Sequence, residues 1–322
     1  METKKPMNAD IEFLSAEHVL EEIDGMRVKG GSPFGRSAAW AFKLAIEQEE
    51  LGSKEALLER IDDLSAKLTA LKPTMGTIAN TIHFVHLCYE QHEQESLEAI
   101  KAAIVKLCER IVDTSLKAVR KLGEYGGALI HDGDTVMMHS YSSSLMSCFE
   151  QAAKNGVKFK MICTESRPLR ESRLAVKMLQ SFGIPVTYIT DASIWEFLPK
   201  ADLVIMGVDA LAYNGDVANK MGAALVTQLA MLCKVPVYVA SEVYKLDYRT
   251  KFGYRIRLER RTKDEMILPD DFESLEGIEV INQFFDLTPS YQVTGVITQY
   301  GIVNPTAVHT LWEQFERDLL AD

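Results

Sequence analysis

Six short apolar runs mark the second part of the sequence, and helix-like stretches of about 10 to 15 residues separate most of them. The runs are TVMMHS, KFKMICTE, PVTYITD, LVIMGVD, VPVYVASE and GVITQYG. Runs this apolar are typical of strands buried on both faces, and parallel strands need a helix-length connection between them. The alternation therefore predicts an α/β fold built on an open, doubly wound parallel sheet.

The residues before this region repeat their apolar side chains every three or four positions, which predicts helices. We expect these helices over 16–26, 35–50, 53–73, 77–91 and 96–126. The interruptions fall at GGSPFG and KPTMG, where glycine and proline break the period. The 322 residues are enough for two domains: a helical N-terminal domain over 1–125 and an α/β domain over 126–322 that carries the ligand pocket.

The net charge and the cysteines argue against several classes of protein. The formal net charge of −11 argues against a protein that binds polyanions through a broad basic surface, although it leaves room for a local phosphate site. The five cysteines are widely spaced and form no CxxC pair, so we expect buried free thiols rather than a disulfide framework or a zinc site. Free thiols, a start without a signal-peptide core and no run of about 18 apolar residues lead us to expect a cytoplasmic protein.

Polar residues follow most of the predicted strands. In a doubly wound sheet the ligand crevice lies outside the carboxyl ends of the strands, so these residues are the candidates for a site. They are Ser140 to Ser144, Thr164 to Arg167, Asp191, Asp209 and Glu242.

The first group, in MMHSYSSSLM, is rich in hydroxyls and precedes a helix. Its hydroxyls and the free N–H groups of that helix suit a phosphate, which makes Ser142 a candidate ligand. In the alternative interpretation Ser142 or Ser143 only caps the helix. Neither of the common nucleotide fingerprints, GxGxxG and GxxxxGK[ST], is present.

The segment CTESRPLRESR places Glu165 and Arg167 at the end of the next strand. A guanidinium there can hold a phosphate through two parallel hydrogen bonds. Alternatively, the two side chains form an ion pair that pins the turn before Pro168. Both interpretations stay open from the sequence.

The segment GVDALAYNGDVANKMG combines a carboxylate, an amide and an ammonium in one loop. Asp209 ends a strand, and we expect Asn219 and Lys220 at the start of a helix. Such a set suits proton transfer on a phosphorylated substrate, with Asp209 as acid or base and Lys220 neutralising the phosphate. In the alternative interpretation the NG pair is a surface turn and Asp209 is a cap.

Two further segments add cations. A later strand end, ASEVYKLD, contributes Lys245, and MRVKGGSPFGRSAA contributes Arg27 and Lys29 before a helix whose N-terminus can face an anion. The glycines of the second segment can equally form a plain hinge between two helices.

Nine segments between about Val19 and Leu311 together resemble one family in order and spacing. They are RVKGG, GRSAA, KPT, DGDTVMMHSYS, TESRP, GVDALAYNGDVANKMG, SEVYKLD, FDLTP and ITQYGIV. This family comprises the alpha, beta and delta subunits of translation initiation factor 2B, the ribose-1,5-bisphosphate isomerases and the methylthioribose-1-phosphate isomerases. The resemblance implies a helical domain, a Rossmann-like domain, and homodimers or dimer-based hexamers. It also implies aldose-1-phosphate to 2-ketose phosphate chemistry in the enzymes, without a metal or nucleotide cofactor.

The resemblance also implies roles for particular residues. In the enzymes a cysteine and an aspartate move the proton, and these positions correspond to Ser140 and Asp209. The phosphate-binding positions correspond to Lys29, Gly30, Gly31, Lys72, Asn219, Lys220 and Lys245. Ser140 is a departure, because a hydroxyl is a far weaker acid than a thiol and needs a neighbouring base. Lys29 and Lys72 replace arginines, which keeps the charge but gives up bidentate geometry.

Two hypotheses follow. In the first, the chain resembles the regulatory subunits of initiation factor 2B and keeps a pocket for a sugar phosphate or a nucleotide monophosphate. Its partners are then itself and other initiation factor subunits, with no direct nucleic acid or membrane contact. In the second, it is a metal-independent aldose-1-phosphate isomerase in which Ser140 or a water replaces the thiol. A third alternative is an orphan dimer whose pocket has drifted.

Overall fold

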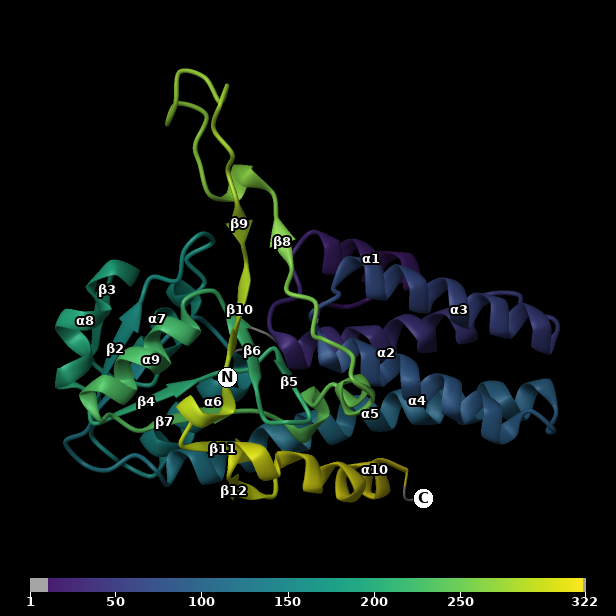
Figure 1. Ribbon diagram of the computed structural model, residues 1–322. Helices are drawn as coiled ribbons and strands as arrows, with labels where there is room; N and C mark the ends of the chain where they lie inside the picture. Colours follow the sequence, from purple (N-terminus) through teal and green to yellow (C-terminus); the bar gives the residue numbers. More distant parts are fainter. Residues whose placement is uncertain (1–10, 321–322) are drawn as a thin grey trace, which may run out of the picture.

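The computed structural model describes residues 11–320 and has a helical half beside an α/β half (Figure 1). The helical half contains α1 (Ala16–Asp24), α2 (Gly31–Gln48), α3 (Lys54–Leu71), α4 (Gly76–His92) and α5 (Leu97–Gly127). These are the five predicted helices. Ser15, Ser53 and Ser96 cap α1, α3 and α5, each accepting a hydrogen bond from a backbone N–H of the first turn. Helix α2 begins at Gly31 rather than at 35, because Pro33 is tolerated in a first turn.

A seven-stranded sheet organises the α/β half, in the order β12-β11-β7-β4-β1-β2-β3. Its strands are β1 (Thr135–Met138), β2 (Lys160–Thr164), β3 (Val186–Ile189), β4 (Leu203–Met206), β7 (Val237–Ala240), β11 (Gly295–Thr298) and β12 (Gly301–Val303). All six predicted strands are present and pair in parallel. Only the short β12 is antiparallel, at one edge, and it was not predicted from the sequence.

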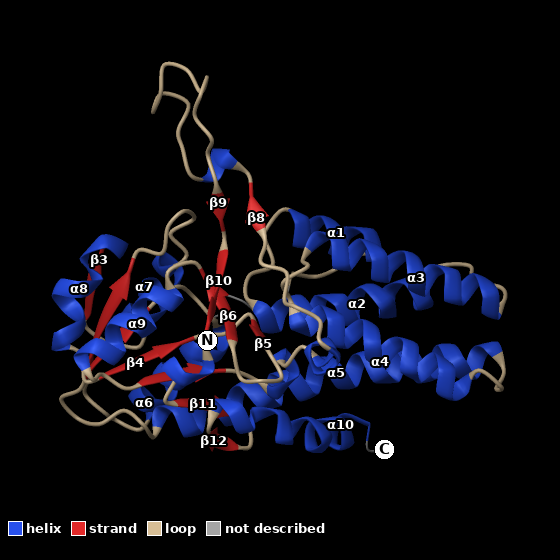
Figure 2. Ribbon diagram, viewed as in Figure 1, coloured by secondary structure: helices blue, strands red, loops and turns tan. Residues whose placement is uncertain are grey.

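Helices cover both faces of this sheet, as the doubly wound prediction requires (Figure 2). One face packs against α5, α6 (Ser143–Lys154) and α7 (Ser172–Ser181), around a core that includes Phe149 and Met161. The other face packs against α8 (Ile194–Phe197) and α9 (Ala223–Cys233), around Val204 and Val226. The predicted α/β fold class is confirmed.

A second, three-stranded sheet, β10-β6-β5, lies beside the main one. It consists of β5 (Ala210–Leu211), β6 (Val217–Lys220) and β10 (Phe285–Thr288). This corrects one prediction: Asn219 and Lys220 lie on strand β6, and the following helix begins only at Ala223. The reason is non-local, because β6 pairs with β10, which lies about 65 residues further along the chain.

Between these elements the chain forms a long projection and a returning helix. Residues 254–284, with the short strands β8 (Arg260–Arg261) and β9 (Asn282–Gln283), rise away from the body (Figure 1). Helix α10 (Trp312–Leu320) returns to the helical half, where Phe315 and Leu319 join its core. The proposed boundary at 125/126 stays a prediction; α5 runs two residues beyond it and packs on the sheet.

Seven short 3₁₀ helices connect the described elements. They are η1 (Asp191–Ser193), η2 (Leu198–Lys200), η3 (Val243–Lys245), η4 (Tyr248–Phe252), η5 (Lys263–Glu265), η6 (Ser290–Gln292) and η7 (Pro305–Leu311). All five cysteines are free, and four of them are buried, as expected; Cys233 is partly exposed. Within residues 11–320, none of the helices combines the length and apolarity needed to cross a bilayer.

Candidate functional site

The carboxyl ends of the central strands meet the N-terminus of α2 at one crevice. Ser142 follows β1 and lies against Gly207, which follows β4; a side chain at Gly207 would collide with it. Gly31, in the first turn of α2, lies beside the loop after β4: a Cβ there would be 3.2 Å from the carbonyl oxygen of Asp209. The helical half therefore closes directly over the strand ends.

A pocket of about 500 Å³ lies near this junction, where Tyr141 of the loop after β1 lines it; among the predicted site residues, Lys29 alone lines this pocket. It draws its walls from three parts of the chain: the turn before α2, the loops after β1 and β2, and the base of the projecting segment. The lining residues are Asp24, Gly25, Met26, Lys29, Tyr141, Leu169, Arg170, Glu171, Arg173, Leu174, Arg261 and Glu265. Four of them are cationic and three are acidic, so the lining carries a small excess of positive charge.

Lys245 and Lys220 are buried beside this crevice. Lys245 donates hydrogen bonds to the carbonyl of Val208, at 2.8 Å, and to the hydroxyl of Ser144, at 3.4 Å. Lys220 lies on β6, with its Nζ 2.6 Å from a carboxylate oxygen of Glu171. Burial lowers the pKa of both ammonium groups, because desolvation disfavours the charged form. An incoming phosphate would reverse that effect by supplying the missing negative charge.

Asp209 is partly buried between these cations. Burial raises the pKa of its carboxyl from 3.8 to about 6, against the opposing charges of Lys245 and Lys220. A carboxyl group with this pKa can exist in both protonation states near neutral pH, which is what a general acid or base needs.

The loop after β1 places His139 next to Ser140, but this imidazole is already engaged by other groups. His139 Nε2 lies 2.9 Å from the carbonyl oxygen of Met221, which can only accept, so this nitrogen carries the proton. His139 Nδ1 then accepts a hydrogen bond from the Thr164 hydroxyl, at 2.7 Å. Both ring nitrogens are therefore engaged, and burial lowers the pKa of this imidazole. The backbone N–H of Ser140 donates to the Ser166 hydroxyl, at 2.7 Å, which fixes the loop.

Several buried polar atoms around the crevice have no hydrogen-bond partner within residues 11–320. They are Ser142 Oγ, Ser143 Oγ and both carboxylate oxygens of Glu242. Arg170 Nε, Glu171 Oε2 and Lys220 Nζ make no well-directed hydrogen bond either, but they do form ion pairs, Arg170 with Glu165 and Lys220 with Glu171. Buried polar atoms are nearly always hydrogen-bonded, so a cluster of exceptions indicates a place for a ligand or for water. Ser142 occupies the N-cap position of α6, yet its hydroxyl makes no capping bond. Ser142 therefore does not cap α6 through its hydroxyl, while the pocket interpretation of the serines stays a prediction.

Strained backbone gathers at the same place. Met26, Ser140, Ser166 and Arg170 all have φ between +54° and +66°, the left-handed region that side chains other than glycine rarely adopt. Two of them line the pocket, and Ser140 adjoins Tyr141, which also lines it. Such strain persists only where the surrounding structure enforces it, and it clusters at functional sites.

The remaining predicted site residues take different positions. Lys29 is exposed at the pocket mouth, while Gly30 is the N-cap of α2, with φ 95°. Lys72 is buried at the end of α3, 3.5 Å from Glu259. Asn219 uses its amide within the protein, donating to the Gly207 carbonyl at 2.7 Å, and so ties β6 to the end of β4.

Arg167 is exposed and points toward the projecting segment rather than into the crevice. Its guanidinium donates to the carbonyl of Met266, at 2.6 Å, and its backbone N–H donates to Asp191. Glu165 instead pairs with Arg170, at 3.3 Å. The ion pair expected in this turn therefore exists, but with a different arginine.

Four residues that line the pocket were not predicted from the sequence: Arg170, Glu171, Arg173 and Arg261. The first three lie in the quoted segment RPLRESR, so the density of charge after a strand end was an available signal. For Arg261 no local signal existed. It follows β7 in the sequence, and only the path of the projecting segment brings it to the pocket.

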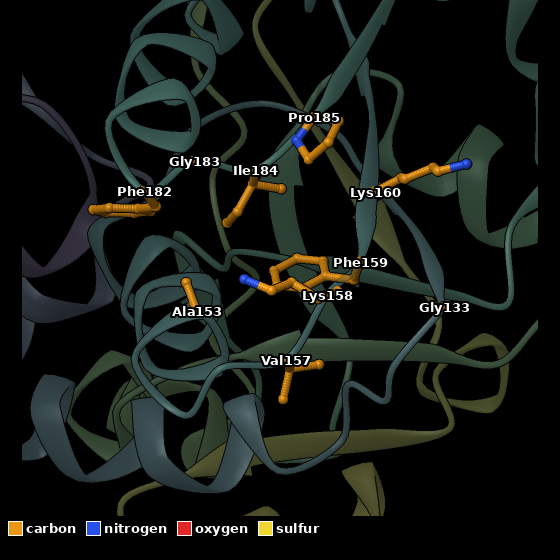
Figure 3. A pocket seen from close by; sticks show the side chains of 10 residues that line it. All are labelled: Gly133, Ala153, Val157, Lys158, Phe159, Lys160, Phe182, Gly183, Ile184 and Pro185. Atoms are coloured by element: carbon orange, nitrogen blue, oxygen red, sulfur yellow. The ribbon is translucent and has the colours of Figure 1, made fainter.

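A second pocket, of about 400 Å³, lies at the opposite edge of the sheet (Figure 3). Its lining includes Gly133, Lys160 and Pro185, which precede or begin β1, β2 and β3. Ligands of doubly wound sheets bind at the carboxyl ends, so this pocket is not the expected place for chemistry. Among the described residues, no group of three or more His, Cys, Asp or Glu side chains is placed to hold a metal ion.

Comparison with known proteins agrees with this arrangement. The sequence profile of the initiation factor 2 subunit family matches residues 27–305. A ribose 1,5-bisphosphate isomerase of Thermococcus kodakarensis is 31% identical over 303 residues, which cover 92% of this chain and 94% of that protein. A methylthioribose-1-phosphate isomerase of Geotalea uraniireducens is 30% identical over 91% of this chain and 88% of its own length.

Solved structures show the same fold. The crystal structure of the translation initiation factor eIF-2B of Pyrococcus horikoshii OT3 is similar with a TM-score of 0.77 and 28% identity. The match covers 90% of this chain and 97% of that one. The similarity thus extends over both the helical half and the sheet.

Proposed function

Since this chain belongs to the initiation factor 2 subunit family, we propose that it binds a sugar phosphate or a nucleotide monophosphate in the strand-end crevice without isomerising it. The observation that carries this proposal is the environment of Ser140. A serine hydroxyl needs a base to release its proton, and the adjacent His139 already uses both ring nitrogens.

The charges and hydroxyls of the crevice support binding of a phosphate. Lys220 and Lys245 are buried ammonium groups whose charge is only partly matched, and the unpartnered hydroxyls of Ser142 and Ser143 can donate to phosphate oxygens. Lys29 lies at the mouth, where it can meet a second charged group of the ligand. In this proposal Gly30 and Gly31 let the N-terminus of α2 approach the ligand, Lys72 adds long-range positive charge, and Asn219 positions β6.

Binding is tested by isothermal titration calorimetry with ribose 1,5-bisphosphate, methylthioribose-1-phosphate and adenosine monophosphate. We expect at least one of these ligands to bind the wild-type protein and to bind Lys245→Met much more weakly. Glu150→Gln, a change on the exposed face of α6, is the control and should bind like the wild type. No binding of any of the three would refute the proposal.

A second candidate function is aldose-1-phosphate isomerase activity, and Asp209 favours it. Its carboxyl has a pKa raised to about 6, as a proton-transfer group needs, and relatives 30–31% identical over most of the chain are named as isomerases. If the wild type forms a ketose phosphate from one of these substrates, and Asp209→Asn does not, this second function replaces the first.

We also propose that the chain forms a homodimer or a dimer-based hexamer, that initiation factor subunits are its further partners, and that it works in the cytoplasm. The projecting segment supports the oligomer, because it carries Leu268, Phe272, Ile278 and Ile281 exposed to solvent. Light scattering of the purified protein tests the oligomer: a mass of about 36 kDa at all concentrations would refute it. The free cysteines support a reducing compartment.

A further inference from the structure

Glu171 already holds the cation that the proposed function assigns to the ligand phosphate. Its Oε2 lies 2.6 Å from Lys220 Nζ, and the two side chains are 15% and 3% exposed. The two residues come from different elements, Glu171 from the residue just before α7 and Lys220 from the end of β6. The aromatic ring of Phe284 lies 3.0 Å from the same ammonium. Lys220 is therefore held between an anion and an aromatic ring.

The contact between these two charges is incomplete. Lys220 Nζ and Glu171 Oε2 both belong to the buried atoms that make no well-directed hydrogen bond within residues 11–320. An ammonium group has three donors, so Lys220 keeps donors for another acceptor. The ion pair therefore balances the two charges but leaves hydrogen-bonding capacity of both groups unused.

Glu171 also lines the crevice itself, among Lys29, Arg170 and Arg173. Its negative charge is felt by Asp209, whose pKa it helps to raise, and by His139. Glu171 is therefore close to the groups that a ligand would meet, and not on a remote surface. A phosphate that reached Lys220 would have to approach this carboxylate or push it aside, and like charges a few ångströms apart repel strongly away from bulk water.

We infer that Glu171 is an internal competitor for Lys220: its carboxylate stands in for the ligand phosphate and is displaced when a phosphorylated ligand binds. This inference rests on the proposed function, because it takes Lys220 as a phosphate ligand. Glu171 is a specificity-determining residue in this account. A ligand carboxylate offers no more charge than Glu171 itself, whereas a phosphomonoester dianion offers more and can displace it. The crevice is thereby selective for phosphate esters.

The test is calorimetric titration of inorganic phosphate and of ribose 1,5-bisphosphate into the wild type, Glu171→Gln, Glu171→Ala and Lys220→Met. Glu171→Gln keeps the shape of the side chain and removes its charge, and we expect it to bind both probes about tenfold to a hundredfold more tightly. Glu150→Gln is the matched control. It removes the same charge from an exposed Glu–Lys pair with a 2.7 Å contact, and it should leave affinity within about twofold.

The outcomes separate this inference from the proposed function. Tighter binding by both Glu171 variants, together with loss of binding in Lys220→Met, supports both. Wild-type binding that depends on Lys220 but is unchanged or weakened in Glu171→Gln and Glu171→Ala overturns the inference and leaves the proposed function standing. No binding of ribose 1,5-bisphosphate or phosphate by the wild type or either Glu171 variant overturns both. Melting temperatures of all the variants identify any that do not fold. If one Glu171 variant does not fold, the affinity of the other one decides between these outcomes.

Discussion

Replacing Asp209 by asparagine should stabilise the protein at neutral pH. The carboxyl has a pKa of about 6 in the folded chain against 3.8 when unfolded. Because the folded-state pKa is the higher one, the stability contributed by this group is fully present below about pH 3.8 and is lost as the pH rises through about 6. An asparagine does not ionise, so it keeps that stability at every pH.

The magnitude follows from the shift of the pKa. A difference of about 2 units, at about 1.4 kcal/mol each, gives a gain of about 3 kcal/mol in the free energy of unfolding at pH 7. At pH 4.5 the folded carboxyl is protonated, and the pH lies less than one unit above the unfolded pKa of 3.8, so the gain falls to about 1 kcal/mol. Urea denaturation of the wild type and of Asp209→Asn at the two pH values measures both numbers.

A matched control is Asp270→Asn, an exposed aspartate of the projecting segment. It should change the free energy of unfolding by less than about 0.5 kcal/mol at either pH. If Asp209→Asn instead destabilises the protein at pH 7, or changes its stability equally at both pH values, then burial does not raise the pKa of Asp209 as described. A gain in stability with a loss of function would mark Asp209 as a residue kept for its chemistry.

Two further substitutions test the architecture around the crevice. Gly207→Ala places a methyl group against the Cβ of Ser142, so the loop after β1 must move. We expect the free energy of unfolding, measured by urea denaturation, to fall by about 1–3 kcal/mol, and ligand binding, measured by calorimetry, to weaken. Unchanged binding would refute the close contact. Phe315→Ala removes a buried ring of α10 from the core of the helical half, next to Phe84 and Trp312. It should lower the free energy of unfolding by about 3–5 kcal/mol. A loss below about 1 kcal/mol would show that α10 does not pack there.

Periodicity sufficed for the main elements of this fold. The apolar runs gave all six parallel strands, and the three-and-four spacing gave the five helices of the N-terminal half, because both patterns are local consequences of burial. The elements that escaped prediction depend on distant partners. Strand β6 forms because β10 pairs with it, and α10 docks on helices about two hundred residues earlier in the chain.

The residues of the candidate site likewise fall into those that local patterns predict and those that depend on distant contacts. The sequence placed Ser140, Ser142, Asp209 and Lys245 at strand ends, and the rule for doubly wound sheets then predicts that they share one edge. Glu171 was inside a quoted segment, but nothing local shows that it meets Lys220. That contact needs the loop after β2 and the strand β6 to be brought together by the whole fold.

The orientation of Arg167 could not be predicted for a related reason. Its guanidinium is drawn to the carbonyl of Met266, which belongs to the projecting segment about a hundred residues later in the chain. The neighbouring Arg170, in the left-handed region with φ 54°, lines the pocket instead. Strand ends thus indicate where a site can lie, while the side chains that line it depend on long-range contacts.

The central claim is that this crevice binds a phosphorylated sugar and lacks only the acid of the isomerisation reaction. The most direct test is phosphorus NMR of ribose 1,5-bisphosphate incubated with the wild type and with Ser140→Cys. A thiol is a far stronger acid than a hydroxyl, so the account predicts no ketose with the wild type and ketose formation with Ser140→Cys. Ketose formation by the wild type, unchanged or reduced in Ser140→Cys, would contradict it.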